Sequence, residues 1–126
     1  MVAMKFLCLI SADTLMEWMS ESEAAKLYEE YRDFTDSLRQ EGRLIDCNRL
    51  LPPDAAITVR VRGGKISTTD GPFVETKEHL GGYYLIEARD LNEALQVAAR
   101  IPGARLGCVE VRPIAEDGQT LRALGR

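Results

Sequence analysis

Hydrophobic and polar positions recur with a changing period along the chain, and the changes mark its elements. Residues 4–10 are apolar on both faces of an extended strand, which is typical of a strand covered on both sides. From residue 20 to residue 42 the apolar positions recur at helical intervals, Ser20 and Glu23 have the spacing of a capping box, and Gly42 is a suitable end. This pattern predicts a long amphipathic helix with a charged, solvated outer face.

Further strands and a second helix are predicted in the rest of the chain. The predicted strands are 43–50, 56–62, 83–87 and 108–114. Asp90 and Glu93 repeat the capping spacing, and a Pro-Gly pair ends the helix that follows them. The residues that this helix should turn inward are Leu91, Ala94, Leu95, Ala98 and Ile101.

A glycine pair after residue 62 predicts a tight hairpin. A two-residue turn pairs Val61 with Ile66 and Arg62 with Lys65. Arg60 then shares the polar face of the ribbon with the other two cations. Like charges that face each other are mildly destabilising, so either water screens them at an exposed tip or an anionic group binds between them.

The order of these elements predicts an α+β fold, a ferredoxin-like β-α-β-β-α-β sandwich with an extra hairpin strand, of the dimeric α+β barrel type. Two helices can cover only one face of such a sheet, although the first strand is apolar on both. A second copy of the chain is the simplest cover for the other face, so we expect a homodimer. Residues 1–126 should form one domain, with its core at about 4–114 and a polar tail at 115–126.

Composition narrows the class of protein further. The chain has 126 residues, a size typical of a single domain, and a net charge of −4, which gives no general attraction for nucleic acid or an anionic membrane. No apolar run is long enough for a membrane span, and the first residues lack the pattern of a secretory signal, so a cytoplasmic location is expected. Cys8, Cys47 and Cys108 have neither disulfide nor metal-site spacing and are interpreted as buried thiols.

Candidate chemistry gathers around the sequence Asp-Gly-Pro-Phe at 70–73. Asp70 can act as a proton acceptor or can cap its own turn. His79, the only histidine, is the side chain best suited to proton exchange near neutral pH, although a lone histidine on a polar loop is more often structural. Tyr83 and Tyr84 point to opposite faces of their strand, so one enters the core and the other faces a cleft. We take Asp70, His79 and Tyr84 as the candidate catalytic residues.

Four other residues are candidates for binding a ligand. Arg60 and Lys77 can pair with a carboxylate, Phe73 can wall a pocket or anchor its loop, and Arg112 can line the cleft or form a salt bridge with Glu110. The sequence contains no His and Cys cluster for a metal and no glycine loop that leads into a helix for a nucleotide phosphate. We therefore expect no metal and no cofactor.

Ordered motifs along the chain are similar to those of the DGPF-type, YCII-related proteins. These motifs are EGRL at 41–44, VRVRGGK at 59–65, DGPFVETKE at 70–78, LGGYYLI at 80–86 and VEVRP at 109–113. The resemblance covers about residues 4–114. It implies a dimeric ferredoxin-like fold, genes that lie beside those of extracytoplasmic-function sigma factors, and no settled biochemical role.

The wider superfamily resembles a dehydrochlorinase of a chlorinated hydroxymuconate, which uses a histidine in the first helix region and an aspartate just before the EGRL segment. The first helix here has no histidine, and Gln40 precedes that segment. Any activity would need other residues. Two hypotheses follow: a homodimeric module that binds a small acidic ligand or a regulatory partner such as a sigma factor, and an enzyme that performs proton transfer or elimination on a small acidic substrate.

Overall fold

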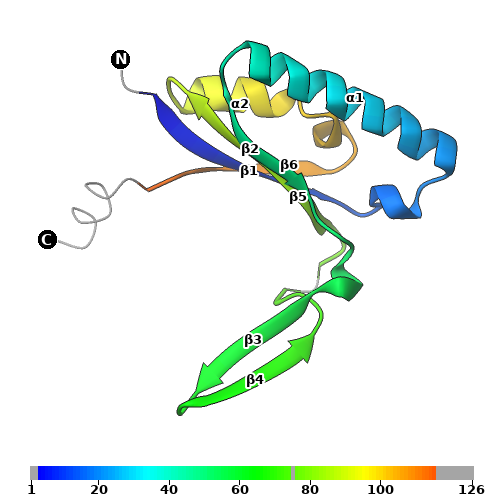
Figure 1. The fold of residues 1–126 in the computed structure, drawn as a ribbon, viewed down its shortest axis with the longest axis vertical. Helices are drawn as coiled ribbons and strands as arrows, with labels where there is room; N and C mark the ends of the chain where they lie inside the picture. The colour runs from blue at the N-terminus through cyan, green and yellow to red at the C-terminus, as the bar shows by residue number, and fades with distance from the viewer. Residues whose placement is uncertain (1–2, 75, 116–126) are drawn as a thin grey trace, which may run out of the picture.

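The computed structural model of the chain describes residues 3–74 and 76–115. Its elements are β1 (Met4–Ala12), η1 (Met16–Trp18), α1 (Glu21–Gln40), β2 (Leu44–Arg49), η2 (Pro53–Ala55), β3 (Ile57–Arg62), β4 (Lys65–Asp70), β5 (His79–Ala88), α2 (Leu91–Ala99), η3 (Pro102–Arg105) and β6 (Cys108–Pro113). Four strands form an antiparallel sheet in the order β2-β5-β1-β6, and both helices lie on one face of it (Figure 1). This order confirms the ferredoxin-like α+β fold; within the described residues the sheet is open and does not close into a barrel.

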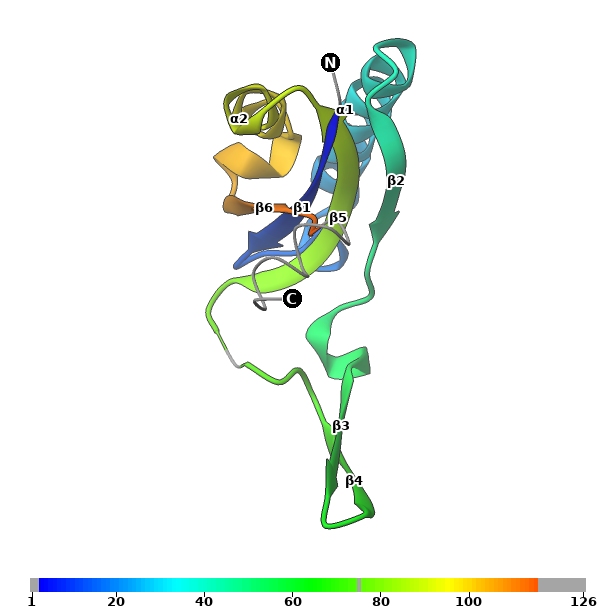
Figure 2. The same cartoon turned by 90° about the vertical axis from the view of Figure 1, so that its left-hand side faces the viewer.

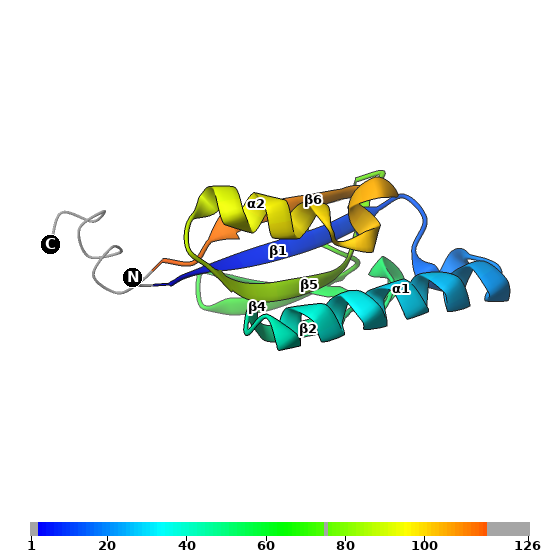
Figure 3. The same ribbon diagram turned by 90° about the horizontal axis from the view of Figure 1, so that it is seen from above.

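Both helices begin as the sequence predicts. The Ser20 hydroxyl accepts a hydrogen bond from the Glu23 N–H at 3.2 Å, and the Asp90 carboxylate accepts one from the Glu93 N–H at 2.9 Å. These bonds satisfy donors that a first helical turn leaves unpaired. Gly42 follows α1 with a φ of 73°, the left-handed conformation that glycine adopts most easily. Seen from above, α1 runs along the β2 side of the sheet and α2 along the β6 side (Figure 3).

The core lies between the helices and this face of the sheet. Phe6, Leu38 and Ile86 are fully buried there, and the cluster continues through α2 to Ile101. The sequence prediction for α2 was partly wrong, because Leu91 and Leu95 are about half exposed and Val97 is buried. Ala94, Ala98 and Ile101 are buried as predicted, so the inward face of α2 is rotated away from the two leucines and toward Val97.

No helix or strand from residues 3–74 and 76–115 covers the other face of the sheet (Figure 1). Leu7, Leu9 and Leu85 lie on this open face at the centre of the sheet, and each is only half-buried. Across the β2 edge, the Tyr83 hydroxyl donates to the Asp46 carboxylate at 2.8 Å and accepts from the Asn48 amide at 2.9 Å. The open face is therefore an apolar centre with a polar rim, as the two-sided apolar pattern of β1 predicted.

The hairpin β3-β4 stands apart from the sheet. It has the predicted two-residue turn and the predicted pairs Val61 with Ile66 and Arg62 with Lys65. It forms a separate two-stranded ribbon and is not an extra strand of the main sheet. We call residues 56–71 the arm. The arm extends from the body on the side opposite the helices (Figure 1, Figure 2).

Candidate functional site

The three candidate catalytic residues lie in three different surroundings. Asp70 is exposed at the base of the arm, opposite Ile57 in the ribbon. The His79 ring, at the start of β5, packs edge-on against the Trp18 ring with the two ring centres 5.3 Å apart. Tyr84 is buried between the sheet and α1, with 5% of its surface exposed. The structure does not bring them together into one proton-transfer site.

The Asp-Gly-Pro-Phe turn fastens the base of the arm. Gly71 has a φ of 97°, its N–H donates to the Ala56 carbonyl at 2.7 Å, and its own carbonyl accepts from the Thr58 hydroxyl at 2.8 Å. Only glycine takes this backbone conformation without strain. In the structure, the glycine of the motif therefore closes the base of the ribbon.

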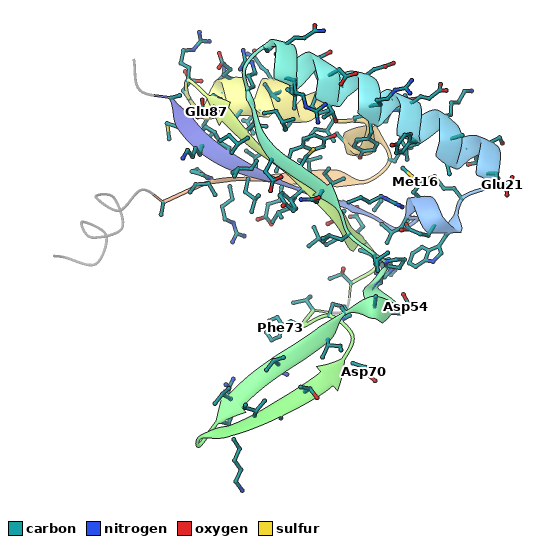
Figure 4. The ribbon with its side chains drawn as sticks, viewed as in Figure 1. Met16, Glu21, Asp54, Asp70, Phe73 and Glu87 are labelled. Carbon is teal, nitrogen blue, oxygen red and sulfur yellow. The ribbon has the colours of Figure 1, made fainter. Side chains whose placement is uncertain are left out.

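Two of the four candidate ligand-binding residues lie together, and the other two are on different segments. The Arg60 guanidinium on the arm lies 5.3 Å from the centre of the Phe73 ring, which Figure 4 shows beside the base of the arm. Lys77 is exposed in the segment that leads to β5. Arg112 forms a 2.6 Å salt bridge with Glu110 on β6, which is one of the two roles expected for it.

A cavity of about 320 Å³ lies elsewhere, between the first half of α1, η1 and the ends of β1, β2 and β5. Its wall includes Ile10, Leu15, Met16, Met19, Leu27, Tyr28, Tyr31, Cys47, Tyr84 and Leu106. This volume falls within the range of natural small-molecule sites, which are mostly apolar with a few polar groups. Of the seven predicted site residues, only Tyr84 lines it.

The hydroxyls of two tyrosines at this wall are engaged within the protein. Thr35 donates its hydroxyl hydrogen to the Tyr31 carbonyl at 2.7 Å, so at 2.6 Å the Tyr84 hydroxyl must donate to the Thr35 oxygen. Burial raises the pKa of Tyr84 to about 12 and also raises the pKa of Tyr31. Both phenols therefore stay protonated near neutral pH, where they can form hydrogen bonds but do not act as bases. Burial likewise raises the pKa of the Cys47 thiol, which disfavours its reactive thiolate.

One ion pair lies at the cavity wall. Arg49, the last residue of β2, donates to the Glu17 carboxylate of η1 at 2.9 Å. The side chain of Arg49 is 55% exposed and that of Glu17 is 26% exposed, so the cation remains accessible from solvent. Next to the pair, the cavity wall at Gly81 and Gly82 consists of backbone atoms without side chains. The arrangement offers an apolar chamber with one cation at its edge.

Gly82 also permits a close approach within the chain. A Cβ atom at this position would lie 2.8 Å from the Asn48 carbonyl oxygen and 3.4 Å from the Arg49 Cα atom. The register of β1 and β5 shifts next to this pair, which confirms that the glycines accompany a bulge. The close backbone is thus that of β2, a neighbouring strand of the same chain.

Two structural findings concern metals and membranes. Among residues 3–74 and 76–115, no group of His, Cys, Asp and Glu side chains is arranged to hold a metal ion. None of the helices in this part of the chain is long and apolar enough to cross a bilayer.

The cysteines differ from one another, because Cys8 is buried, Cys47 is half-buried and Cys108 is exposed. The prediction of three buried thiols was therefore wrong for Cys108, which lies at the start of the edge strand β6.

The sequence model of the YCII-related domain family matches residues 4–116. The chain belongs to this family. A stretch of 78 residues of this YCII-related protein is 45% identical to an uncharacterised protein of Rhizobium meliloti (strain 1021). That stretch is 60% of this chain and 63% of the relative, so the match spans less than two thirds of the relative's length.

Sequence reasoning missed the cavity of this YCII-related protein, although several of its residues carried a usable signal. Tyr28 and Tyr31 belong to the apolar stripe of α1 and were assigned to ordinary core packing. Tyr31 packs against the core and also lines the cavity. Met16 comes from η1, a short helix that was not predicted, and Met19 directly follows it. Figure 4 shows Met16 in the body, well away from Asp70 on the arm.

Proposed function

We propose that this YCII-related protein is a small-ligand-binding module that works as a homodimer, and that its ligand is a small carboxylic acid with an apolar body. The cavity at α1, η1 and β2 is the observation that carries the proposal. It supplies apolar and aromatic wall for the body of a ligand. Sites of this composition gain affinity from the apolar wall and specificity from the few polar groups.

The Arg49 guanidinium is the group that would recognise the carboxylate. It already holds a carboxylate, that of Glu17, at 2.9 Å. A guanidinium presents several N–H donors in a plane, so a ligand carboxylate can share Arg49 with Glu17 or replace it. The ligand would thereby place its charge at the exposed end of the site and its apolar part in the cavity.

Thermal unfolding in the presence of 2-naphthoate tests this proposal, with 2-naphthylmethanol as the uncharged control. A ligand at a hundred times its dissociation constant stabilises the folded state by about 2.7 kcal/mol. For a domain of this size that corresponds to a rise of roughly 10 °C in the unfolding temperature. We expect a clear rise with the acid and a smaller one with the alcohol.

Two arginine variants separate a specific site from surface binding. In Arg49→Gln the acid should lose its advantage over the alcohol, because the cation at the cavity is gone. In Arg89→Gln, which removes a similarly exposed cation paired with Asp90 and Glu93 outside the cavity wall, the advantage should persist. If the acid and the alcohol raise the unfolding temperature of the unmodified protein equally, the site does not recognise a carboxylate. If neither compound raises it, the cavity is not a site for small acids with an apolar body.

Cysteine alkylation gives a second readout that does not depend on stability. Cys47 lines the cavity and Cys108 does not. A bound ligand should slow the reaction of iodoacetamide with Cys47 and leave the reaction at the exposed Cys108 unchanged. Equal protection of both thiols would indicate a general change of the protein and not occupation of the cavity.

The regulatory side of the proposal rests on the family resemblance. An extracytoplasmic-function sigma factor is the partner that this resemblance implies. Co-purification of the two proteins from cells that express both at native levels tests the association. Recovery of the sigma factor with the wild-type chain, and not with an unrelated protein carrying the same tag, is the expected result; its absence from the purified material would remove this partner from the proposal.

A further inference from the structure

One short segment supplies a continuous part of the cavity wall. Residues 14–19 connect the end of β1 to the start of α1 and contain η1, and we call them the flap. Figure 4 shows Met16 on this segment, near the first turn of α1 at Glu21. The flap residues that line the cavity are Thr14, Leu15, Met16, Glu17 and Met19. A movement of the flap would therefore open the cavity.

The backbone of the flap is bonded only to itself within residues 3–74 and 76–115. The Trp18 N–H donates to the Leu15 carbonyl at 2.9 Å, and the Met19 N–H donates to the Met16 carbonyl at 3.2 Å. The strands of the sheet are held by ladders of backbone hydrogen bonds to their neighbours. The flap has no such ladder, so its side chains must hold it against the body.

Leu15 anchors the flap in the body. Its side chain is buried, and the missing side chain at Gly81 makes room for it, because a Cβ atom there would lie 2.9 Å from the Leu15 Cδ2 atom. This contact lies at the N-terminal end of the flap. It leaves the following residues to be held from the surface.

Two surface contacts hold the rest of the flap. The Glu17 carboxylate accepts from Arg49 at 2.9 Å, and among the described residues this is the one hydrogen bond from the flap to the body. The Trp18 side chain is half exposed, and its ring packs edge-on against His79. A partly exposed ion pair and a single aromatic pair are each weak contacts. The loss of either one therefore matters for the position of the flap.

Arg49 connects the flap to the occupation of the cavity. While the flap is closed, Glu17 holds this guanidinium; when the flap is open, the guanidinium is free for another carboxylate. A ligand shifts an equilibrium between two states only when it binds one of them better. An acid that needs Arg49 binds the open state better, because there it does not compete with a carboxylate of the protein.

We propose that Glu17 latches the flap to Arg49 and that an acidic ligand opens the flap by taking Arg49 from Glu17. Glu17 is then a built-in competitor of the ligand, and the ion pair is a regulatory contact. The release by a ligand rests on the proposed function, whereas the latch does not.

Nuclear magnetic resonance tests the latch without any ligand. Trp18 and His79 are the only tryptophan and the only histidine, so the nuclear Overhauser signal between their ring protons is identified by residue type and reports the closed flap. Glu17→Gln should weaken this signal by about twofold or more, the order of effect that one partly exposed ion pair supports. Arg49→Gln should weaken it to the same degree, and the double variant should add nothing further.

Two controls accompany these variants. Glu29→Gln removes the same charge from an exposed position on α1 outside the cavity wall and should leave the Trp18–His79 signal unchanged. The signal between Phe34 and Tyr84, whose ring centres are 5.2 Å apart in the core, shows in every variant that the fold is intact.

Three results overturn the latch. One is a Trp18–His79 signal that Glu17→Gln does not weaken. Another is a pair of single variants with opposite effects, which would indicate the influence of local charge. The third is a double variant in which the two effects add, because partners in one contact cannot lose it twice.

The release by a ligand is tested with the two compounds named above. In isotope-labelled wild-type protein, unlabelled 2-naphthoate should weaken the Trp18–His79 signal and 2-naphthylmethanol should not, because only the acid competes with Glu17. If 2-naphthoate raises the unfolding temperature but leaves this signal intact, the release is overturned and the cavity is kept. If 2-naphthoate does not bind while the variants still weaken the signal, the proposed ligand fails and the latch is kept.

Discussion

The close contact at Gly82 leads to a prediction about the joint between β2 and β5. In Gly82→Ala the added Cβ atom would sit 2.8 Å from the Asn48 carbonyl oxygen, a distance that real Cβ atoms essentially never show. The atoms it meets belong to backbone in a hydrogen-bonded strand, so they cannot rotate away. Relief requires β2 to move outward along its pairing with β5. Forced overpacking of this kind costs about 1–3 kcal/mol.

The neighbouring glycine provides a matched control. A Cβ atom at Gly81 would lie 2.9 Å from the Cδ2 atom of Leu15, which is the end of a flexible side chain and can turn aside. Gly81→Ala should therefore cost under about 1 kcal/mol. With roughly 4 °C per kcal/mol for a domain of this size, Gly82→Ala should lower the unfolding temperature by roughly 4–12 °C. Urea titration and thermal unfolding measure both variants; a Gly82→Ala protein as stable as Gly81→Ala would refute the reasoning.

Three further predictions concern the core and its titratable groups. Leu38→Ala removes a fully buried side chain and should cost about 2–5 kcal/mol of unfolding free energy in urea titration. The Tyr84 phenol ionises near pH 10 in the unfolded chain and at about 12 in the fold, so the unfolded state loses its proton first and stability falls as pH rises through this interval. In Tyr84→Phe that alkaline fall should be shallower, while a fall as steep as in the wild type would contradict the assigned burial. Burial also raises the pKa of Cys8 to about 11, and its side chain is fully buried, so mass spectrometry after brief iodoacetamide treatment at pH 8 should find it unmodified until urea unfolds the protein.

Local chemistry made much of the fold predictable. The capping pairs at Ser20 and Asp90 fixed where the helices begin, because a side-chain acceptor three residues before a free N–H is a local arrangement. The register of the arm followed from its two-residue turn, which leaves no freedom in the pairing of the flanking strands. The placement of both helices on one face was also predictable, because two helices can cover only one face of such a sheet.

Long-range packing was not predictable in the same way. Alternation along β5 shows that Tyr83 and Tyr84 face opposite sides, but only the position of α1 makes Tyr84 the buried one. The cavity depends on residues from β1, η1, α1, β2 and β5 together with Leu106, which lie between positions 10 and 106 and share no motif. The Asp-Gly-Pro-Phe motif drew attention as a candidate active centre because it concentrates chemistry in the sequence, whereas the structure uses its glycine to close a ribbon.

The place where the arm is inserted has a consequence for how the molecule can vary. Residues 50–78 leave the sheet after β2 and return to it at β5, and these two strands are paired, with Arg49 opposite Gly82. The body is thus complete on either side of the insertion, and the ends to be joined are already neighbours. A change of length or surface in this segment leaves the cavity wall and the core untouched. The arm can therefore diverge among such proteins while the cavity stays the same.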